Sequence, residues 1–332
     1  MKRSSKTAAR LTLFLSLALL LILSACGRSG TGSIVEGKVN VVTTFYPIYE
    51  FASAIGGEDV NVINLLPTGV EPHDWTPRGQ DIVNTSKAQL FFYNGAGLEG
   101  WVPDFLKGLD SNSKVKAVEV SQGIDLITTT EDDGHNHGTA EEDHDHEGEE
   151  HAEDSADAKH IDPHTWVSPK SALIMAGNIR DSLIEADPAH KAGYEERYTA
   201  LAGKLKQLDQ EFTEKLSTVS KKEIVVSHQA FGYLTRDYGL TQHAIMGLSP
   251  DSEPRAQDML NLAKLVKEDG IRYIFFEELV SDKLAKTLAG EAGVETLVLN
   301  PVEGLTEQQA KDGDDYFSLM QKNLQNLLLA LQ

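Results

Sequence analysis

Short apolar runs rich in β-branched and aromatic residues alternate with amphipathic segments along the first half of the chain. The runs predict buried strands at 39–46, 60–66, 88–94 and 114–120. The spacing of apolar residues between them predicts helices at 48–57 and 78–87. Because strands alternate with helices, we expect a parallel sheet covered by helices on both faces, which is the α/β class.

The same alternation returns after a predicted helix at 168–185. Further strands are predicted at 223–227, 241–247, 271–278 and 295–301. Further helices are predicted at 230–239, 255–270, 281–293 and 314–331. The 332-residue chain therefore predicts two halves, each built of about four β/α units and long enough to have its own core.

An unusually long helix is predicted between the two halves. Asp187 and Pro188 form a good N-cap and first-turn pair. Apolar residues then follow at spacings of three and four, at Tyr194, Tyr198, Leu201, Leu205, Leu208, Phe212, Leu216 and Val219. A helix over 188–219 would be about 45–50 Å long at about 1.5 Å per residue. This length suits a strut that runs along two lobes.

Residues 128–160 interrupt the pattern with an acidic, histidine-rich stretch that has no apolar period. We expect it to be a disordered or surface loop. Its histidines are His135, His137, His144, His146, His151 and His160. Imidazole and carboxylate at this density can hold a divalent metal, so the stretch could be a metal site, an auxiliary to a site elsewhere, or a solvated spacer.

The net charge of −21 is concentrated in this stretch. Residues 131–160 contain 13 acidic residues and one lysine, a local charge of −12. We expect no nucleic-acid partner, because nucleic acids are recognised by basic surfaces and this chain is acidic.

The first 26 residues have the pattern of a secretory signal. A basic segment (MKRSSKTAAR) precedes an apolar run that is short for a transmembrane helix. The run ends in LSAC (23–26), which matches a bacterial lipobox, so we expect Cys26 to become the lipidated N-terminus and residues 27–37 to form a tether. Cys26 is the only cysteine, which excludes a disulfide and a thiolate metal site within the mature domain.

Three histidines outside the loop share one context. His73 and His228 follow predicted strands, and His164 lies in the motif DPHTW. Ligands of open parallel sheets bind beyond the carboxyl ends of the strands, so these positions indicate a shared site. A single histidine near a loop is more often a cap or a hydrogen-bonding residue, but three in comparable positions favour the site. We expect His190 to be a surface residue and His243 to bond locally.

A carboxylate at a strand end could complete this site. Glu277 ends the predicted strand 271–278, and Glu303 follows the strand 295–301. Three imidazoles and one carboxylate suit tetrahedral zinc. The set has no thiolate to favour copper(I) and too few oxygens for calcium or magnesium.

Taken together, the motifs resemble those of ZnuA-like zinc-binding lipoproteins of bacterial metal ABC importers, in the cluster A-I or TroA superfamily. The motifs are TFYP (44–47), LLPTGVEPHDW (65–75), the His-rich loop, DPHTWVSP (162–169), VSHQAFGYL (226–234), FFEE (275–278) and LNPVEGL (299–305). The resemblance covers essentially the whole mature chain. It implies two (β/α)4-type lobes joined by a single long rigid helix, with the metal in the cleft between the lobes.

This resemblance implies a division of the chain and a set of ligands. The division is a signal peptide (1–25), a lipidated tether (26–37), an N-terminal lobe (38–186), a linking helix (187–219) and a C-terminal lobe (220–332). The implied zinc ligands are His73, His164, His228 and Glu303, although some members use water as the fourth ligand. Manganese-binding relatives typically have Glu and Asp at the third and fourth positions, so His228 and Glu303 indicate zinc.

Glu277 and Glu71 are the expected residues behind the ligands, where they would orient one of them or close the cleft. The expected function is capture of Zn²⁺ outside the cytoplasm by a monomer anchored to the cell membrane through Cys26. The protein would present zinc to a membrane permease and its ATPase, and the loop would be an auxiliary zinc collector.

Three alternatives remain. A manganese or iron binder of the same family is one, and a surface adhesin is another, although nothing in the sequence encodes an adhesive surface. A zinc hydrolase with Glu71 or Glu277 as general base is the third. The chain has no HExxH motif, and four protein ligands would close the metal site to water, so we expect no enzyme.

Overall fold

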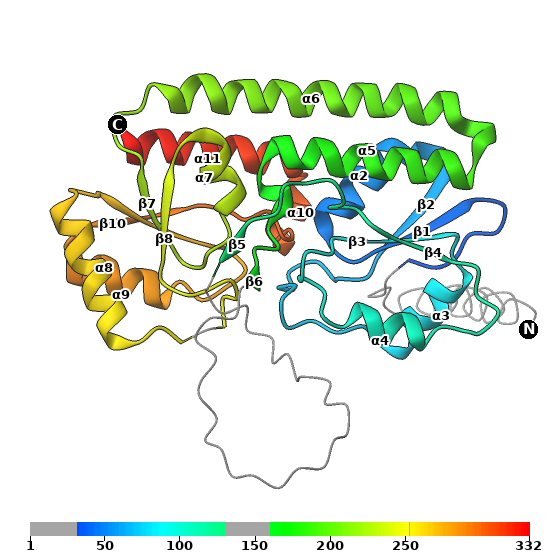
Figure 1. The fold of residues 1–332 in the computed structure, drawn as a ribbon, viewed down its shortest axis with the longest axis horizontal. Helices are drawn as coiled ribbons and strands as arrows, with labels where there is room; N and C mark the ends of the chain where they lie inside the picture. The colour runs from blue at the N-terminus through cyan, green and yellow to red at the C-terminus, as the bar shows by residue number, and fades with distance from the viewer. Residues whose placement is uncertain (1–31, 130–159, 252) are drawn as a thin grey trace, which may run out of the picture. The chain divides into compact units, whose positions relative to one another are not determined.

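The computed structural model describes residues 32–129, 160–251 and 253–332 (Figure 1). The predicted signal peptide, Cys26 and the loop histidines from His135 to His151 lie outside the described residues. Within the described ranges, no helix is both long and apolar enough to cross a membrane.

The first lobe is built on a four-stranded parallel sheet with the strand order β2-β1-β3-β4. Its strands are β1 (Val39–Thr43), β2 (Val60–Asn64), β3 (Leu90–Tyr93) and β4 (Lys116–Glu119). Its helices are α2 (Tyr46–Gly56), α3 (Gly79–Lys87), α4 (Val102–Lys107) and α5 (Pro169–Ala186). The central strand β1 is almost entirely buried, as expected for a parallel sheet covered on both faces.

The second lobe repeats this plan with the strand order β10-β9-β7-β8, again all parallel. Its strands are β7 (Glu223–Val226), β8 (Thr241–Ala244), β9 (Tyr273–Phe276) and β10 (Glu295–Val298). Its helices are α7 (Gly232–Tyr238), α8 (Ala256–Glu268), α9 (Lys283–Ala292), α10 (Glu307–Asp312) and α11 (Tyr316–Leu331). The predicted α/β class with two parallel sheets is confirmed.

The long helix α6 (Lys191–Ser217) connects the two lobes and runs past helices of both, as Figure 1 shows. At its first-lobe end, the Arg197 guanidinium donates to the carbonyl oxygens of Ile55 and Gly56, at 2.6 and 2.9 Å. At its second-lobe end, Asp209 accepts a hydrogen bond from the Tyr238 hydroxyl. These contacts make α6 a strut, as the sequence pattern predicts.

The strut is shorter than its apolar pattern predicts. Residues Pro188–His190 form a 3-10 turn, and the α-helix begins only at Lys191, so its 27 residues span roughly 40 Å. The Asp187 carboxylate does not cap the backbone. It contacts His190 Nδ1 at 2.5 Å and accepts from the Tyr194 hydroxyl at 2.9 Å, which explains the later start.

One hydrophobic cluster extends across both lobes, and Trp166 lies within it. Each lobe also has a smaller cluster of its own. Trp166 is fully buried, and its ring meets that of Phe45 edge-on at 4.6 Å between centroids. Its indole N–H donates to the carbonyl oxygen of Pro301 in the second lobe at 2.7 Å. Its own carbonyl oxygen accepts from the Tyr316 hydroxyl at 2.7 Å. The chain on either side of Trp166 is therefore fixed to both lobes.

Some short elements have no periodic signal in the sequence. The helices α4 and α10 have six residues each, fewer than two turns, so a helical period cannot be read from them. Strands β5 (Thr128–Thr129) and β6 (His160–Ile161) pair antiparallel at the two ends of the His-rich stretch. The first predicted strand is also too long, since Tyr46 and Pro47 begin α2, where proline is well tolerated.

Candidate metal centre

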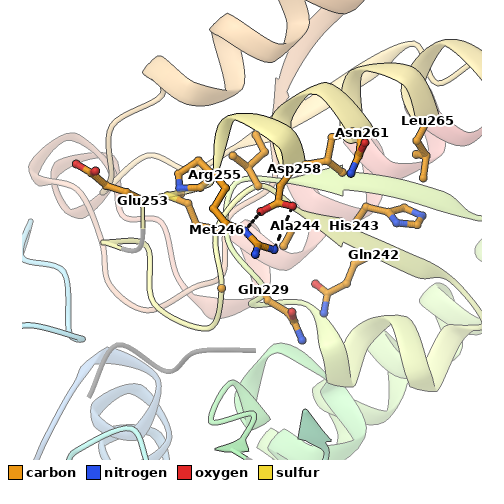
Figure 2. A pocket seen from close by; sticks show the side chains of 14 residues that line it. Gln229, Gln242, His243, Ala244, Met246, Glu253, Arg255, Asp258, Asn261 and Leu265 are labelled. Atoms are coloured by element: carbon orange, nitrogen blue, oxygen red, sulfur yellow. Dashed lines mark hydrogen bonds and ion pairs between the residues drawn. The ribbon is translucent and has the colours of Figure 1, made fainter. Parts of the chain in front are cut away.

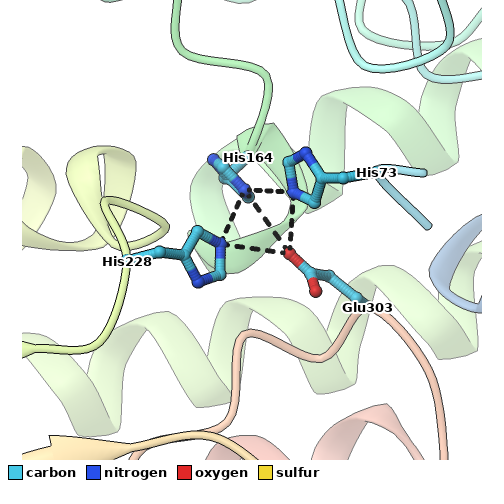
Figure 3. Close-up of side chains that lie close together, drawn as sticks. All are labelled: His73, His164, His228 and Glu303. Atoms are coloured by element: carbon cyan, nitrogen blue, oxygen red, sulfur yellow. Dashed lines mark hydrogen bonds and ion pairs between the residues drawn. The ribbon is translucent and has the colours of Figure 1, made fainter. Parts of the chain in front are cut away.

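Four side chains from four separate loops meet between the two sheets (Figure 3). His73 lies in the loop after β2, and His164 precedes the 3-10 turn Thr165–Val167. His228 follows β7 by two residues, and Glu303 lies in the loop after β10. All four are buried, with exposed fractions of 6% for His73, 2% for Glu303 and 0% for the other two.

The donor atoms of these residues have the spacing of a tetrahedron. The Nε2 atom of His164 lies 3.2 Å from Nε2 of both His73 and His228. The Oε1 atom of Glu303 lies 3.4 Å from Nε2 of His164, and 3.5 Å from Nε2 of each of the other two histidines. Four ligands at about 2.0–2.2 Å from a tetrahedral zinc lie about 3.3–3.6 Å from one another. These donor atoms therefore fit a zinc ion at their centre.

The Glu303 carboxylate places one oxygen atom in a buried position. Among the described residues, its Oε1 atom is buried and has no hydrogen-bond partner. A buried carboxylate oxygen is stabilised by a bound cation or a hydrogen bond, and leaving it without either is costly. This atom is the one that lies within the tetrahedron, which fits a cation at its centre.

Two of the histidines are oriented by carboxylates behind them. His164 Nδ1 lies 2.9 Å from Asp162 Oδ1, and the same oxygen accepts from the His164 backbone N–H. His228 Nδ1 lies 2.8 Å from Glu277 Oε1. When Nδ1–H donates to a carboxylate, the lone pair of Nε2 is directed to the opposite side, which here is the centre of the cluster.

Asp162 is a residue of this centre that the sequence analysis did not identify. Its signal is local, because an Asp side chain readily accepts the backbone N–H of the residue two positions ahead. In the motif DPHTW that residue is His164, so the Asp162 carboxylate is brought next to the imidazole it orients.

Glu71 lies beside the cluster but not in it. Both of its carboxylate oxygens accept from the His73 backbone N–H at 3.0 Å, and its Oε1 is 3.9 Å from His73 Nε2. Burial, together with the charge of Glu303, raises the pKa of Glu71 to about 8. Glu71 therefore fixes the backbone of the loop that carries His73.

The pKa values of the clustered side chains are shifted in different directions. Burial lowers the pKa of His73 to about 4, because a buried imidazolium loses its hydration. Burial also opposes the charge on His228, but Glu277 and Glu303 outweigh it and hold the pKa of His228 well above its ordinary value. Burial opposes the charge on Glu303 too, and the three imidazoles outweigh it, so its pKa lies well below its ordinary value. A metal ion that binds here must displace a proton.

The other described histidines lie elsewhere. His190 has a half-exposed side chain and is paired with Asp187, in agreement with the expected surface position. His243 bonds Glu223 at 2.7 Å, the local contact that we expected. His160 lies in β6, outside the four-residue cluster.

A separate hollow of about 640 Å³ lies on the second lobe, between β8 and α8 (Figure 2). His243 and Asp258 are among the residues that line it, and none of the four clustered donors does. Asp258 is already paired with Arg255 at 2.8 Å. This hollow is therefore distinct from the metal centre.

Known proteins resemble the chain over most of its length. The model of the family ZnuA, zinc-uptake complex component A, periplasmic, matches residues 41–330. The zinc-binding protein AdcA of Streptococcus pyogenes serotype M3 is 44% identical over 296 residues, which are 89% of this chain and 56% of AdcA. The high-affinity zinc uptake system protein ZnuA of Bacillus subtilis is 40% identical over 319 residues, 95% of each chain.

Solved structures show the same fold. The crystal structure of the Zn(II)-bound ZnuA-like domain of Streptococcus pneumoniae AdcA is 39% identical and superimposes with a TM-score of 0.72. The match covers 89% of this chain and 99% of that domain. The chain thus spans little more than half of the Streptococcus pyogenes AdcA but nearly all of the Bacillus subtilis protein. With residues 41–330 matched by the family model, the chain belongs to the ZnuA family.

Proposed function

We propose that this protein captures zinc between its two lobes and presents it to the membrane permease of an ABC importer, whose ATPase drives uptake. The observation that carries this proposal is the set of four buried donor atoms at the spacing of a zinc tetrahedron. The proposed ligands are His73, His164, His228 and Glu303. The zinc-related names of the relatives in this family support the same metal.

The arrangement supports holding a metal rather than catalysis. A catalytic zinc keeps one coordination position for water and has a general base nearby. Here four protein donors occupy the tetrahedral positions. The two candidate bases are engaged, since Glu277 bonds His228 and Glu71 bonds the backbone of His73. A hydrolase is therefore not supported.

Metal preference tests this function directly. We expect metal-free protein to bind one zinc ion in the tight site and to bind manganese more weakly, because an imidazole-rich donor set suits zinc better than manganese. Calorimetric titration with each metal, at the same pH and salt, measures the two affinities. Tighter binding of manganese than of zinc would instead support the manganese-binding alternative.

Attachment to the outer face of the cell membrane is part of the proposal. The LSAC motif at 23–26 supports a lipid at Cys26, which would hold a monomeric domain near the permease. Residues 131–158 are proposed to be a weak zinc collector, since they contain five histidines and many carboxylates and precede the motif DPHTW, which carries the proposed ligand His164.

Deletion of residues 131–158 separates the collector from the tight site. The proposed ligands lie outside the deleted stretch, so we expect the tight site to keep its affinity while weaker additional zinc is lost. Equilibrium dialysis against a range of zinc concentrations measures both, and growth of cells starved of zinc should be poorer. Loss of the tight site would contradict this division of roles, and unchanged zinc capacity and growth would support a spacer.

A further inference from the structure

His164 supplies one vertex of the donor tetrahedron. Its Nε2 atom lies within 3.4 Å of all three other donor atoms, so a shift of His164 changes three edges of the tetrahedron together. Asp162 sets the rotation of the imidazole. The position of the loop that carries His164 depends on the contacts of the residues next to His164.

One buried side chain, Asn94, holds the residues on both sides of His164. Asn94 follows β3 directly and is fully buried. Its Nδ2 atom donates to the carbonyl oxygen of Pro163 at 2.8 Å. Its Oδ1 atom accepts from the Thr165 hydroxyl, also at 2.8 Å. A single amide thus fixes the chain immediately before and immediately after His164.

Asn94 is in turn fixed to the end of the first sheet. Its backbone N–H donates to Glu99 Oε1 at 2.8 Å, and the Thr44 hydroxyl donates to the same oxygen at 2.6 Å. Thr44 follows β1 and Asn94 follows β3, which are neighbours in the sheet. Glu99 therefore joins the carboxyl ends of two strands at the point where Asn94 reaches the loop of His164.

We propose that Asn94 is a positioning residue for the metal centre, which fixes His164 Nε2 in the donor set and so sets the affinity and the tetrahedral geometry of the bound metal. This inference rests on the zinc-binding function proposed above. Moving the loop would break both buried hydrogen bonds between the Asn94 amide and the residues that flank His164, so the network resists displacement of His164. None of these groups needs to touch the metal.

Replacing Asn94 tests the proposal. Asn94→Ala is expected to weaken zinc binding by about 10- to 100-fold, the range typical of residues that hold metal ligands in place. Cobalt(II) is the spectroscopic probe, because tetrahedral cobalt absorbs visible light strongly and loses intensity as its geometry loosens. We expect the full chain carrying Asn94→Ala to bind cobalt with a weaker and shifted visible spectrum.

A milder pair of variants covers the case in which Asn94→Ala fails to fold. Thr165→Val removes only the hydroxyl that donates to Asn94 and preserves the shape of the side chain. It is expected to lower zinc affinity and to alter the cobalt spectrum in the same direction. Thr165→Ser retains the hydroxyl and should restore both.

Asn178 provides the matched control. Its Nδ2 atom donates to the carbonyl oxygens of Val120 and Gln122, each at 2.8 Å, and neither belongs to the loop of His164. Asn178→Ala removes a comparable pair of hydrogen bonds from the same lobe, so we expect a lower melting temperature with unchanged zinc affinity and cobalt spectrum.

The outcomes separate the two proposals. Wild-type zinc affinity and cobalt spectrum in Asn94→Ala, or in Thr165→Val, would overturn the positioning role alone. Equal losses of affinity in the Asn94 and Asn178 variants would also overturn it, because they would show general destabilisation. Absence of zinc binding by the unaltered protein would overturn the proposed function and the inference together.

Discussion

A variant carrying both His73→Ala and His228→Ala is expected to lose tight zinc binding. These residues supply one proposed ligand from each lobe, and only His164 and Glu303 would remain. Residues that merely orient a metal ligand contribute about 10- to 100-fold in affinity. Removing two ligands should therefore weaken binding by at least about 100- to 10,000-fold, or about 2.7–5.5 kcal/mol. Competition with a chromophoric zinc chelator measures the change.

The control for this variant replaces two histidines outside the centre. His190 is half exposed, and His243 bonds Glu223 in the second lobe. The pair His190→Ala and His243→Ala removes the same number of imidazoles, and its zinc affinity should match that of the unaltered protein. Unchanged affinity in the His73 and His228 variant would show that the tight site lies elsewhere. Circular dichroism of both variants checks that the fold is retained.

Zinc affinity is expected to fall steeply as the pH falls. Burial opposes the charge on His228, but Glu277 and Glu303 outweigh it and raise the pKa of His228, so zinc competes with a proton for this imidazole. Each displaced proton changes the affinity by about tenfold per pH unit, which predicts about 100-fold weaker binding at pH 6 than at pH 8 for one proton. The pKa of His73 is about 4, so His73 stays neutral over this range and contributes no proton.

A variant that alters the charge behind His228 tests the cause of this dependence. Glu277→Gln removes the charge that contributes most to raising the pKa of His228. Its zinc affinity should therefore depend less steeply on pH near neutrality, even though the affinity itself is lower. Chelator competition at several pH values, corrected for protonation of the chelator, gives both slopes. Affinity that is constant from pH 6 to pH 8 in the unaltered protein would refute the proton displacement.

The sequence is informative about the sheets because their periodicity is local. Each predicted strand of the two lobes contains the observed one, although the observed strands have only four or five residues. The ends differ because strand length depends on pairing with neighbours far away in the chain. The start of α6 could not be predicted, since Asp187 there contacts the side chains of His190 and Tyr194 and the first turn after it is a 3-10 turn.

The metal centre is partly predictable for a related reason. The carboxyl ends of parallel strands lie on one side of a sheet, so histidines after such strands are candidates to meet. Glu277 and Glu303 have the same local context, however, and the sequence pattern alone leaves both open. The family resemblance favours Glu303 as the ligand, and in the folded chain Glu303 Oε1 faces the three Nε2 atoms while Glu277 contacts the far side of His228.

The shared core around Trp166 has a consequence for the order in which the protein folds. Trp166 bonds Pro301, 135 residues later, and accepts from Tyr316, 150 residues later. The ring of Tyr316 also packs against Phe51 of the first lobe, at 5.0 Å between centroids. Contacts over such long stretches of chain form slowly. The packing of Trp166 and Phe51 against this part of the second lobe can therefore be completed only after the last helix has been synthesised.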